Sequence, residues 1–313
     1  MVVKMGWFNK DVVNILDFNR EDIEFLFSKA DEMRKQLKEK KVKKTLSDKI
    51  VGLAFFEPST RTRMSFETAA KRLGAETVGF TGEEGTSVAK GETFADTIKM
   101  LDSYVDAIVL RHKFEGAALF ASDIAQNPII NGGDGKSHHP TQAMLDLYTT
   151  KTLFGEIDGL TFVLIGDLKY SRTVSSLIYG LSMFKPKEII LISPQQLKLR
   201  EEIKLFAIDH GLRLREEENI EAISEADIIY VTRIQKERFP DLQEYEKVKG
   251  SYKITKKLLE MHAKKTAKVL HPLPRVDELS PDVDNTNYQA YFLQAGLGVP
   301  LRMALLSLVL GGE

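Results

Sequence analysis

The sequence predicts an α/β protein with two doubly wound parallel-sheet domains and an active site in the cleft between them. Apolar strand-like runs alternate with helical patterns along the chain. The alternation restarts after a turn near Gly155–Gly159, and 313 residues suit about two domains. Strands that alternate with helices favour parallel sheets covered on both faces. We expect domains at 1–150 and 151–296, with a C-terminal helix at about 297–313 packing back on the first.

The first set of elements begins with a helix that Asn19 can cap and that runs to Leu37. Gly74 follows a second helix, expected at 59–73, and is a typical helix stop. We expect the remaining elements of this domain to be strands at 49–56, 77–80, 107–111 and 128–130, a loop at 82–91, and helices at 92–104, 115–125 and 140–154.

The second set has four apolar runs that read as buried strands, at 160–165, 188–192, 227–232 and 268–270. Helices are expected at 173–184 and 203–210. The apolar run 301–310 is too short to cross a bilayer and predicts a terminal helix docked on a core.

Composition excludes several classes of protein. The 44 basic and 45 acidic residues nearly balance, which disfavours a nucleic-acid partner. The absence of Cys excludes disulfides, thiolate metal sites and a cysteine nucleophile. No run of 18 apolar residues exists, and the N-terminal residues 1–7 are too short and charged for a signal peptide, so we expect a cytoplasmic protein without a membrane segment.

Polar residues follow the first strand, where a parallel sheet binds ligands. Ser59, Thr60, Arg61 and Thr62 stand at the predicted start of a helix. A helix N-terminus with free N–H groups, hydroxyls and a guanidinium is suited to an anion. The alternative is a capped helix with exposed arginines, and the strand–turn–helix context favours phosphate.

Further candidates follow the later strands of the first domain. Arg111 ends one strand, and His139 and Gln142 stand at the start of a helix after another. Gly135-Lys136-Ser137 mimics the end of a P-loop, but Ile130 occupies the position of its first glycine, so a nucleotide P-loop is excluded. We expect His138 and His139 to point differently, with His139 and Gln142 as substrate contacts.

In the second domain, Arg172 and Thr173 open a helix after a strand and suit a carboxylate. A single glycine precedes them, so the dinucleotide fingerprint fails. Arg233 and Gln235 follow another strand, and the prolines around Leu273 leave free carbonyls after the last one. Several arginines thus follow strands in a two-domain α/β chain, and this pattern predicts one cleft that binds anionic substrates.

Together these motifs resemble the aspartate/ornithine carbamoyltransferase family along nearly the whole chain. The motifs that carry the resemblance are Phe56-Glu-Pro-Ser-Thr-Arg-Thr-Arg63, Thr86-Ser-Val-Ala-Lys-Gly-Glu-Thr93, His139-Pro-Thr-Gln142, Gly166-Asp-Leu-Lys-Tyr170, Thr232-Arg-Ile-Gln-Lys-Glu-Arg238 and His271-Pro-Leu-Pro-Arg275. The last two favour the members that use aspartate, since the ornithine members typically carry His-Cys-Leu-Pro in the matching loop.

The resemblance implies transfer of the carbamoyl group of carbamoyl phosphate to the amine of L-aspartate, giving N-carbamoyl-L-aspartate and phosphate, as in de novo pyrimidine biosynthesis. No cofactor and no metal are implied. The implied carbamoyl phosphate contacts are Ser59, Thr60, Arg61, Thr62, Ser87, Lys90, Arg111, His139, Gln142 and the carbonyls of Pro272 and Leu273. The implied aspartate contacts are Lys90, Arg172, Thr173, Arg233 and Gln235. Of these, Arg61, Thr62, Lys90, Arg111 and His139 are expected to be catalytic.

The resemblance also implies a homotrimer whose active sites are shared, because Ser87 and Lys90 match a loop that enters the neighbouring subunit. Glu57 and Arg238 match groups involved in domain closure. Whether separate regulatory chains join is left open. The alternatives are a related enzyme with another amine acceptor, such as ornithine, and a non-catalytic anion-binding protein on the same fold.

Overall fold

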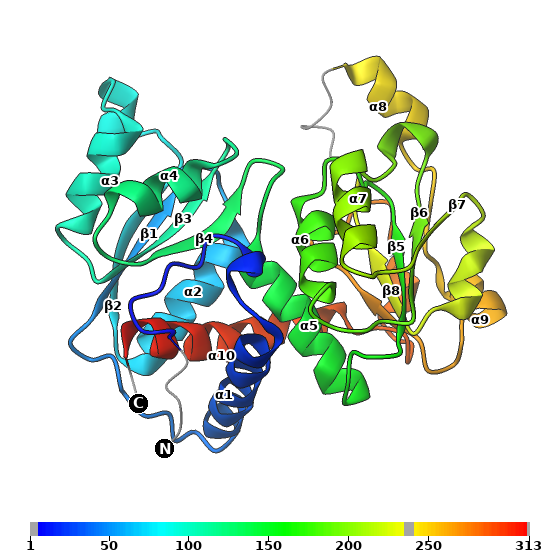
Figure 1. Ribbon diagram of the computed structural model, residues 1–313, viewed down its shortest axis with the longest axis horizontal. Helices are drawn as coiled ribbons and strands as arrows, with labels where there is room; N and C mark the ends of the chain where they lie inside the picture. The colour runs from blue at the N-terminus through cyan, green and yellow to red at the C-terminus, as the bar shows by residue number, and fades with distance from the viewer. Residues whose placement is uncertain (1–5, 235–240, 312–313) are drawn as a thin grey trace. The chain divides into compact units, whose positions relative to one another are not determined.

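The computed structural model describes residues 6–234 and 241–311 (Figure 1). The chain divides into two compact units. Unit 1 holds the chain up to Leu145 together with the segment from Leu297, and unit 2 holds Asp146–Gly296. The division falls within the helix α5 (Pro140–Phe154), as does the predicted boundary at 150. The segment from Leu297 therefore returns to the first unit.

Unit 1 is built on a parallel sheet with the strand order β2-β1-β3-β4. Helices α3 and α4 cover one face of this sheet, and α2 lies on the other face (Figure 1). Alternate residues such as Ala54, Ile108 and Leu110 pack against α3 and α4. The bounds of these elements are β1 Ile50–Phe55, α2 Thr60–Leu73, β2 Glu76–Thr81, α3 Phe94–Asp102, β3 Ala107–His112, α4 Ala117–Ile124 and β4 Ile129–Asp134.

The caps of the first helices agree with the sequence pattern. Helix α1 (Arg20–Lys38) begins after Asn19, whose side chain accepts a hydrogen bond from the Asp22 N–H in a capping box. Helix α2 ends at Gly74, which is left-handed at φ 93°. The segment expected as a plain loop at 82–91 contains one short 3₁₀ helix, Ser87–Lys90.

Unit 2 contains a parallel sheet with the order β7-β6-β5-β8-β9. Helices α6 and α7 lie on one side of it and α9 on the other (Figure 1). The bounds are β5 Thr161–Ile165, α6 Arg172–Leu181, β6 Glu188–Ile192, α7 Glu201–Asp209, β7 Leu214–Glu217, β8 Ile228–Val231, α8 Leu242–Val248, α9 Lys256–His262 and β9 Lys268–Leu270. Strand β7 and helices α8 and α9 were not predicted.

Helix α10 (Tyr291–Leu310) begins earlier than expected and contains Pro300. Within the described part of the chain it is the one helix long and apolar enough to cross a membrane by composition. Yet 72% of its apolar window is buried in the structure, as in a core helix of a folded unit. Its Arg302 is 3% exposed and lies 4.9 Å from the centre of the Phe66 ring on α2. This contact ties the end of the chain into unit 1.

Candidate active site

Each sheet has a point where the strand order reverses, and most predicted site residues follow the strands at these two points. In unit 1 the reversal lies between β1 and β3, because the chain winds outward from them to β2 and β4. In unit 2 it lies between β5 and β8. The crevice at the carboxyl end of such a pair is the usual ligand site of doubly wound sheets.

The N-terminus of α2 follows β1 directly and has an unused cap. Ser59 is at the N-cap position, but its side chain makes no capping hydrogen bond, and the first turn holds no acidic residue. By contrast, Asn19 and Thr93 cap α1 and α3 with their side chains. Arg61 is exposed and Thr62 is 7% exposed. The hydroxyls and N–H groups of this turn therefore form a positive helix end suited to an anion.

Arg111 holds the carboxyl ends of three strands together. Its Nε lies 3.2 Å from Glu57 Oε2 after β1, and one terminal N–H donates to the Gly132 carbonyl of β4 at 3.2 Å. Its own carbonyl accepts the Phe56 N–H at 2.9 Å. A side chain at Gly132 would meet Thr62 at 3.5 Å, so the start of α2 also packs here. Arg111 and Thr62 thus both lie next to Gly132.

The two adjacent histidines diverge, as predicted. His138 Nε2 lies 3.4 Å from the Asn14 side chain, whereas His139 Nδ1 lies 3.5 Å from Thr141 Oγ1. His139 is 4% exposed, and Gln142 is 8% exposed and donates its N–H to the His139 carbonyl at 3.0 Å. His139 therefore directly precedes α5, and Gln142 stands in its first turn.

Strand β4 continues through Asn131–Asp134, which corrects the predicted end at 130. The Asn131 side chain donates to Val13 O at 3.1 Å and to Asp134 Oδ1 at 3.0 Å, and accepts the Gly133 N–H at 2.7 Å. Asp134 Oδ2 accepts the Gly116 N–H at 2.9 Å. These two residues fix the backbone that leads from the reversal point to His139.

Ser87 and Lys90 are both exposed on the loop after β2. The loop itself is anchored, because Val88 packs on the core beside Phe56 and Phe94. Glu83 adds an ion pair with Lys113 at 2.9 Å. The loop thus presents a lysine and a serine to its surroundings from a fixed base.

In unit 2, a glycine turn brings β5 to the start of α6. Gly166 has φ +113°, and a Cβ there would lie 2.2 Å from the Thr232 carbonyl oxygen. Thr232 donates its N–H to Ile165 O at 2.8 Å. Arg172, 7% exposed, is the first residue of α6, and Thr173 Oγ1 lies 3.0 Å from Ser171 Oγ. As in α2, the side chain at the N-cap makes no capping bond.

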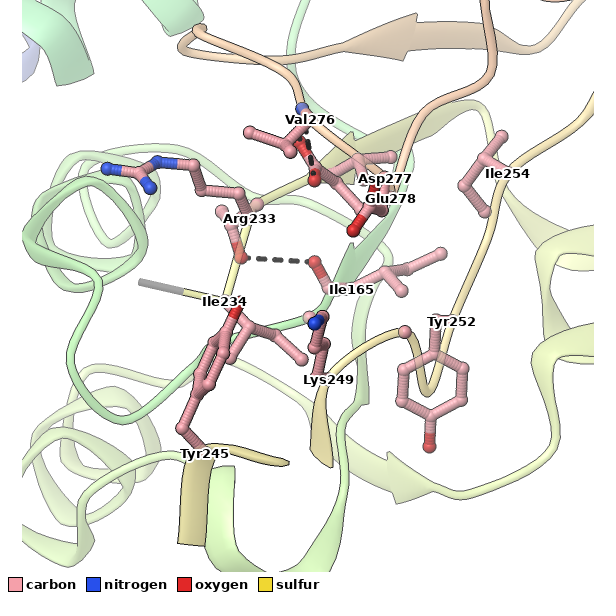
Figure 2. Close-up of a pocket in the computed structure, with 14 residues that line it drawn as sticks. Ile165, Arg233, Ile234, Tyr245, Lys249, Tyr252, Ile254, Val276, Asp277 and Glu278 are labelled. Atoms are coloured by element: carbon pink, nitrogen blue, oxygen red, sulfur yellow. Dashed lines mark hydrogen bonds between the residues drawn. The ribbon is translucent and has the colours of Figure 1, made fainter. Parts of the chain in front are cut away.

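A pocket of about 110 Å³ opens at the reversal point of this sheet (Figure 2). Arg233 comes from the segment after β8, and Figure 2 shows its guanidinium pointing away from Tyr252 and Ile254. Tyr245 of α8, Lys249 directly after α8, and Glu278 of the segment after β9 also line it. Sequence analysis missed these last three residues. Tyr245 lies in the unpredicted helix α8 and Lys249 directly follows it. For Glu278, the only signal in the sequence was its proximity to the His271–Arg275 motif.

The segment after β9 is held by His271. The ring Nδ1 accepts the Leu273 N–H at 2.7 Å, and Nε2 lies 2.8 Å from Glu278 Oε1. Burial raises the pKa of the Glu278 carboxyl, but hydrogen bonds from His271 and from the Val276 N–H outweigh it and hold the pKa below its usual value. Arg275 donates to Asp284 Oδ2 at 2.7 Å, so this arginine fastens the same segment.

The remaining predicted site residues either have a different partner, lie outside the described residues, or are only partly exposed. Glu57 is paired with Arg111 of its own unit. Gln235 and Arg238 lie outside the described residues. Pro272 and Leu273 are partly exposed beside His271. In the described parts of the chain, no three His, Asp or Glu side chains group in a way that could hold a metal ion.

The fold defines a two-unit α/β protein in which arginine side chains stand at or after the strands of each reversal point. Residues 10–152 match the model of the "Aspartate/ornithine carbamoyltransferase, carbamoyl-P binding domain", and residues 158–309 match that of the "Asp/Orn binding domain". The chain belongs to the aspartate/ornithine carbamoyltransferase family.

Relatives and solved structures agree with this membership. The chain is 60% identical to the aspartate carbamoyltransferase catalytic subunit of Hyperthermus butylicus, with 98% of both chains covered. It is 56% identical to that of Staphylothermus marinus, covering 98% of this chain and 99% of the relative. The catalytic subunit of M. jannaschii aspartate transcarbamoylase is similar in structure, with a TM-score of 0.87, 47% identity, and 95% and 96% of the two chains covered. The Trypanosoma cruzi enzyme in complex with carbamoyl phosphate and aspartate has a TM-score of 0.93 at 37% identity, with 97% and 98% covered.

Proposed function

We propose that this chain is an aspartate carbamoyltransferase, which transfers the carbamoyl group of carbamoyl phosphate to the amine of L-aspartate. The products are N-carbamoyl-L-aspartate and phosphate. The observation that carries the proposal is the pair of cationic sites at the two strand reversals, in a chain similar to a transcarbamoylase solved with both substrates. We also propose that the reaction belongs to pyrimidine biosynthesis, as the name of the relatives implies.

The α2 start is the proposed phosphate site. Ser59, Thr60, Arg61 and Thr62 would hold the phosphate, because the helix end has an unused cap and no acidic side chain. Arg111, Thr62 and His139 would contact the carbamoyl oxygen. Arg111 is suited to this role because Glu57 and Gly132 already fix its guanidinium. Gln142 and the carbonyls of Pro272 and Leu273 would orient the carbamoyl NH₂ group.

The aspartate site is proposed in unit 2. Arg172 and Thr173 would bind the α-carboxylate at the start of α6, where the N-cap side chain makes no capping bond. Arg233 and Gln235 would bind the β-carboxylate, with Arg233 at the rim of the pocket in Figure 2. A planar guanidinium suits each carboxylate because it can donate two parallel hydrogen bonds.

These residues need only position and stabilise the reactants. The neutral amine of aspartate attacks the carbamoyl carbon, an oxyanion forms on the carbamoyl oxygen, and the bond to phosphate breaks. Two polyanions repel each other in water, so the arginines offset that repulsion and hold the attack geometry. Donors from Arg111 and His139 would stabilise the oxyanion, a contribution of roughly 10²–10³ in rate for one such donor. The departing phosphate would accept the proton of the amine.

Ornithine is the alternative acceptor, and one observation favours it: two carboxylates, Asp277 and Glu278, line the pocket beside Arg233. A cationic side chain would bind to such groups. However, the Glu278 carboxylate is already used by the His271 ring and the Val276 N–H, and Lys249 adds a positive charge to the pocket. The pocket therefore favours an anionic acceptor.

Assembly is part of the proposal. We infer a homotrimer in the cytoplasm, in which Ser87 and Lys90 enter the active site of the neighbouring chain. The exposure of both side chains on an anchored loop supports this, since loops of this length usually have a function. A ring of identical heterologous contacts lets every subunit give and receive one loop. Domain closure would pair Glu57 with Arg172 and Arg238 when both substrates are bound.

The experiment is an assay of the purified chain with carbamoyl phosphate and either L-aspartate or L-ornithine. Formation of N-carbamoyl-L-aspartate without carbamoyl ornithine supports the proposal. Comparable turnover of ornithine would refute the choice of acceptor. Binding of carbamoyl phosphate without any product would indicate a non-catalytic anion-binding protein.

A further inference from the structure

A fully buried carboxylate in unit 2 joins two parts of the proposed site. Asp146 of α5 is 0% exposed. Its Oδ2 accepts the hydroxyl proton of Tyr230 at 2.8 Å, and its Oδ1 accepts from Gln294 Nε2 at 2.6 Å. Tyr230 belongs to β8 and Gln294 to α10, so one side chain bonds two elements that are far apart in the sequence.

The Tyr230 arm of this network leads to the start of α6. A side-chain hydrogen bond joins Tyr230 to Thr173. Because the hydroxyl proton of Tyr230 is directed to Asp146, its oxygen is the acceptor and the Thr173 hydroxyl is the donor. Thr173 Oγ1 in turn lies 3.0 Å from Ser171 Oγ. The carboxylate therefore gives this chain of hydroxyls a single direction.

The Gln294 arm leads to the segment after β9. Gln294 Oε1 accepts the backbone N–H of His271 at 2.9 Å, which fixes the orientation of the amide. Its NH₂ group consequently faces Asp146 and donates to it. His271 then binds Leu273 N and Glu278, so this arm ends at the carbonyls proposed to orient the carbamoyl group.

We propose that Asp146 is a positioning residue for the transfer reaction, which fixes Thr173 through Tyr230 and the His271–Leu273 segment through Gln294. The proposal rests on the proposed function, because Thr173 is assigned there to aspartate and Leu273 to the carbamoyl group. A buried acceptor with two partners is costly to replace, since the loss of one partner leaves a polar group unsatisfied. Asp146 would not touch either substrate.

The test separates the two arms by kinetics. Tyr230→Phe removes only one hydroxyl and should raise the KM for aspartate roughly fivefold with kcat little changed, as expected for the loss of one hydrogen bond. Gln294→Leu should instead lower kcat roughly tenfold with little change in that KM. Asp146→Asn should produce both effects. Tyr179→Phe is the matched control, since Tyr179 is a half-buried tyrosine of α6 in the same unit and should leave both constants unchanged.

The decisive comparison is the double variant of Asp146→Asn with Tyr230→Phe. If Asp146 acts on aspartate through Tyr230, the double variant has the same KM for aspartate as the more impaired single variant. Multiplied effects, or a Tyr230→Phe protein identical to the control, would overturn the proposal. The Tyr230→Phe comparison remains available if Asp146→Asn does not fold. A wild-type chain that forms no carbamoyl aspartate would instead refute the proposed function.

Discussion

Replacement of Gly166 by alanine should damage both the stability of unit 2 and the proposed aspartate site. Gly166 stands at φ +113°, and an added Cβ would lie 2.2 Å from the Thr232 carbonyl oxygen. The left-handed backbone costs an L residue about 1–2 kcal/mol. The contact with backbone adds roughly 1–3 kcal/mol, because the strand must shift. We expect a loss of roughly 2–5 kcal/mol in the free energy of unfolding.

Guanidinium unfolding followed by circular dichroism measures the stability, and the KM for aspartate measures the site. Thr232 directly precedes Arg233, so a displaced strand end should raise that KM while leaving the affinity for carbamoyl phosphate intact. Gly211→Ala is the control: Gly211 has φ +77° and no atom within 4 Å of an added Cβ. It should cost only about 1 kcal/mol. Equal losses in the two variants would refute the role of the close approach.

Three further predictions concern charge, closure and assembly. The Glu278 pKa is lowered in the fold, so its contribution to stability is full above the unfolded pKa of about 4.5 and is lost as the pH falls through the folded pKa. Glu278→Gln should therefore flatten the acid side of the stability profile, and an unchanged profile would contradict this. Glu57→Ala should leave carbamoyl phosphate binding nearly intact, because the Gly132 carbonyl still holds the Arg111 guanidinium, but it should impair turnover. Solution scattering should show no compaction with both substrates, and compaction equal to wild type would count against the closure pairing. Mixed Arg61→Ala and Lys90→Ala chains should recover roughly a quarter of the active sites, since half the pockets and half the loops are intact. A Lys90→Ala chain that is active alone, or is not rescued by mixing, would exclude a shared site.

The sequence predicted those elements whose local signals agree with their packing. Helix α1 has its Asn19 cap, and β1 is an apolar run with neighbours on both sides. Strand β7 was missed because Leu214–Glu217 is short and mostly charged. Its charges pair across the edge of the sheet, with Arg215 bonded to Glu188 at 3.1 Å, so an exposed edge rather than a core defines this strand.

Long-range contacts explain the other differences. The glycines after Ile130 read as a loop, yet the Asn131 side chain bonds Val13 and keeps the strand extended. The apolar run 301–310 predicted a late start for α10, but the helix begins at Tyr291 and continues through Pro300, with most of its apolar window buried. Packing against distant segments decides both cases, and local propensity does not contain that information.

Site residues could be predicted where their position after a strand indicates a ligand contact. Hydrogen bonds between side chains from distant elements could not be predicted. Arg111 was assigned from its place at the end of β3, and Arg172 from its place after β5. The Tyr230–Asp146–Gln294 network was not predicted. Its three residues lie on three mainly apolar elements, and only the fold brings their polar groups together. A buried carboxylate in a helical pattern gives no signal of its partners.

The most direct test of the proposed activity is the product formed from carbamoyl phosphate with aspartate or ornithine, measured for wild type and Arg233→Ala. We predict carbamoyl aspartate and no carbamoyl ornithine from wild type. In the variant, the KM for aspartate should rise by at least about a hundredfold, as expected for a lost charge-assisted pair, with carbamoyl phosphate binding retained. Carbamoyl ornithine from the wild-type chain, or an Arg233→Ala variant with unchanged aspartate kinetics, would contradict the assignment.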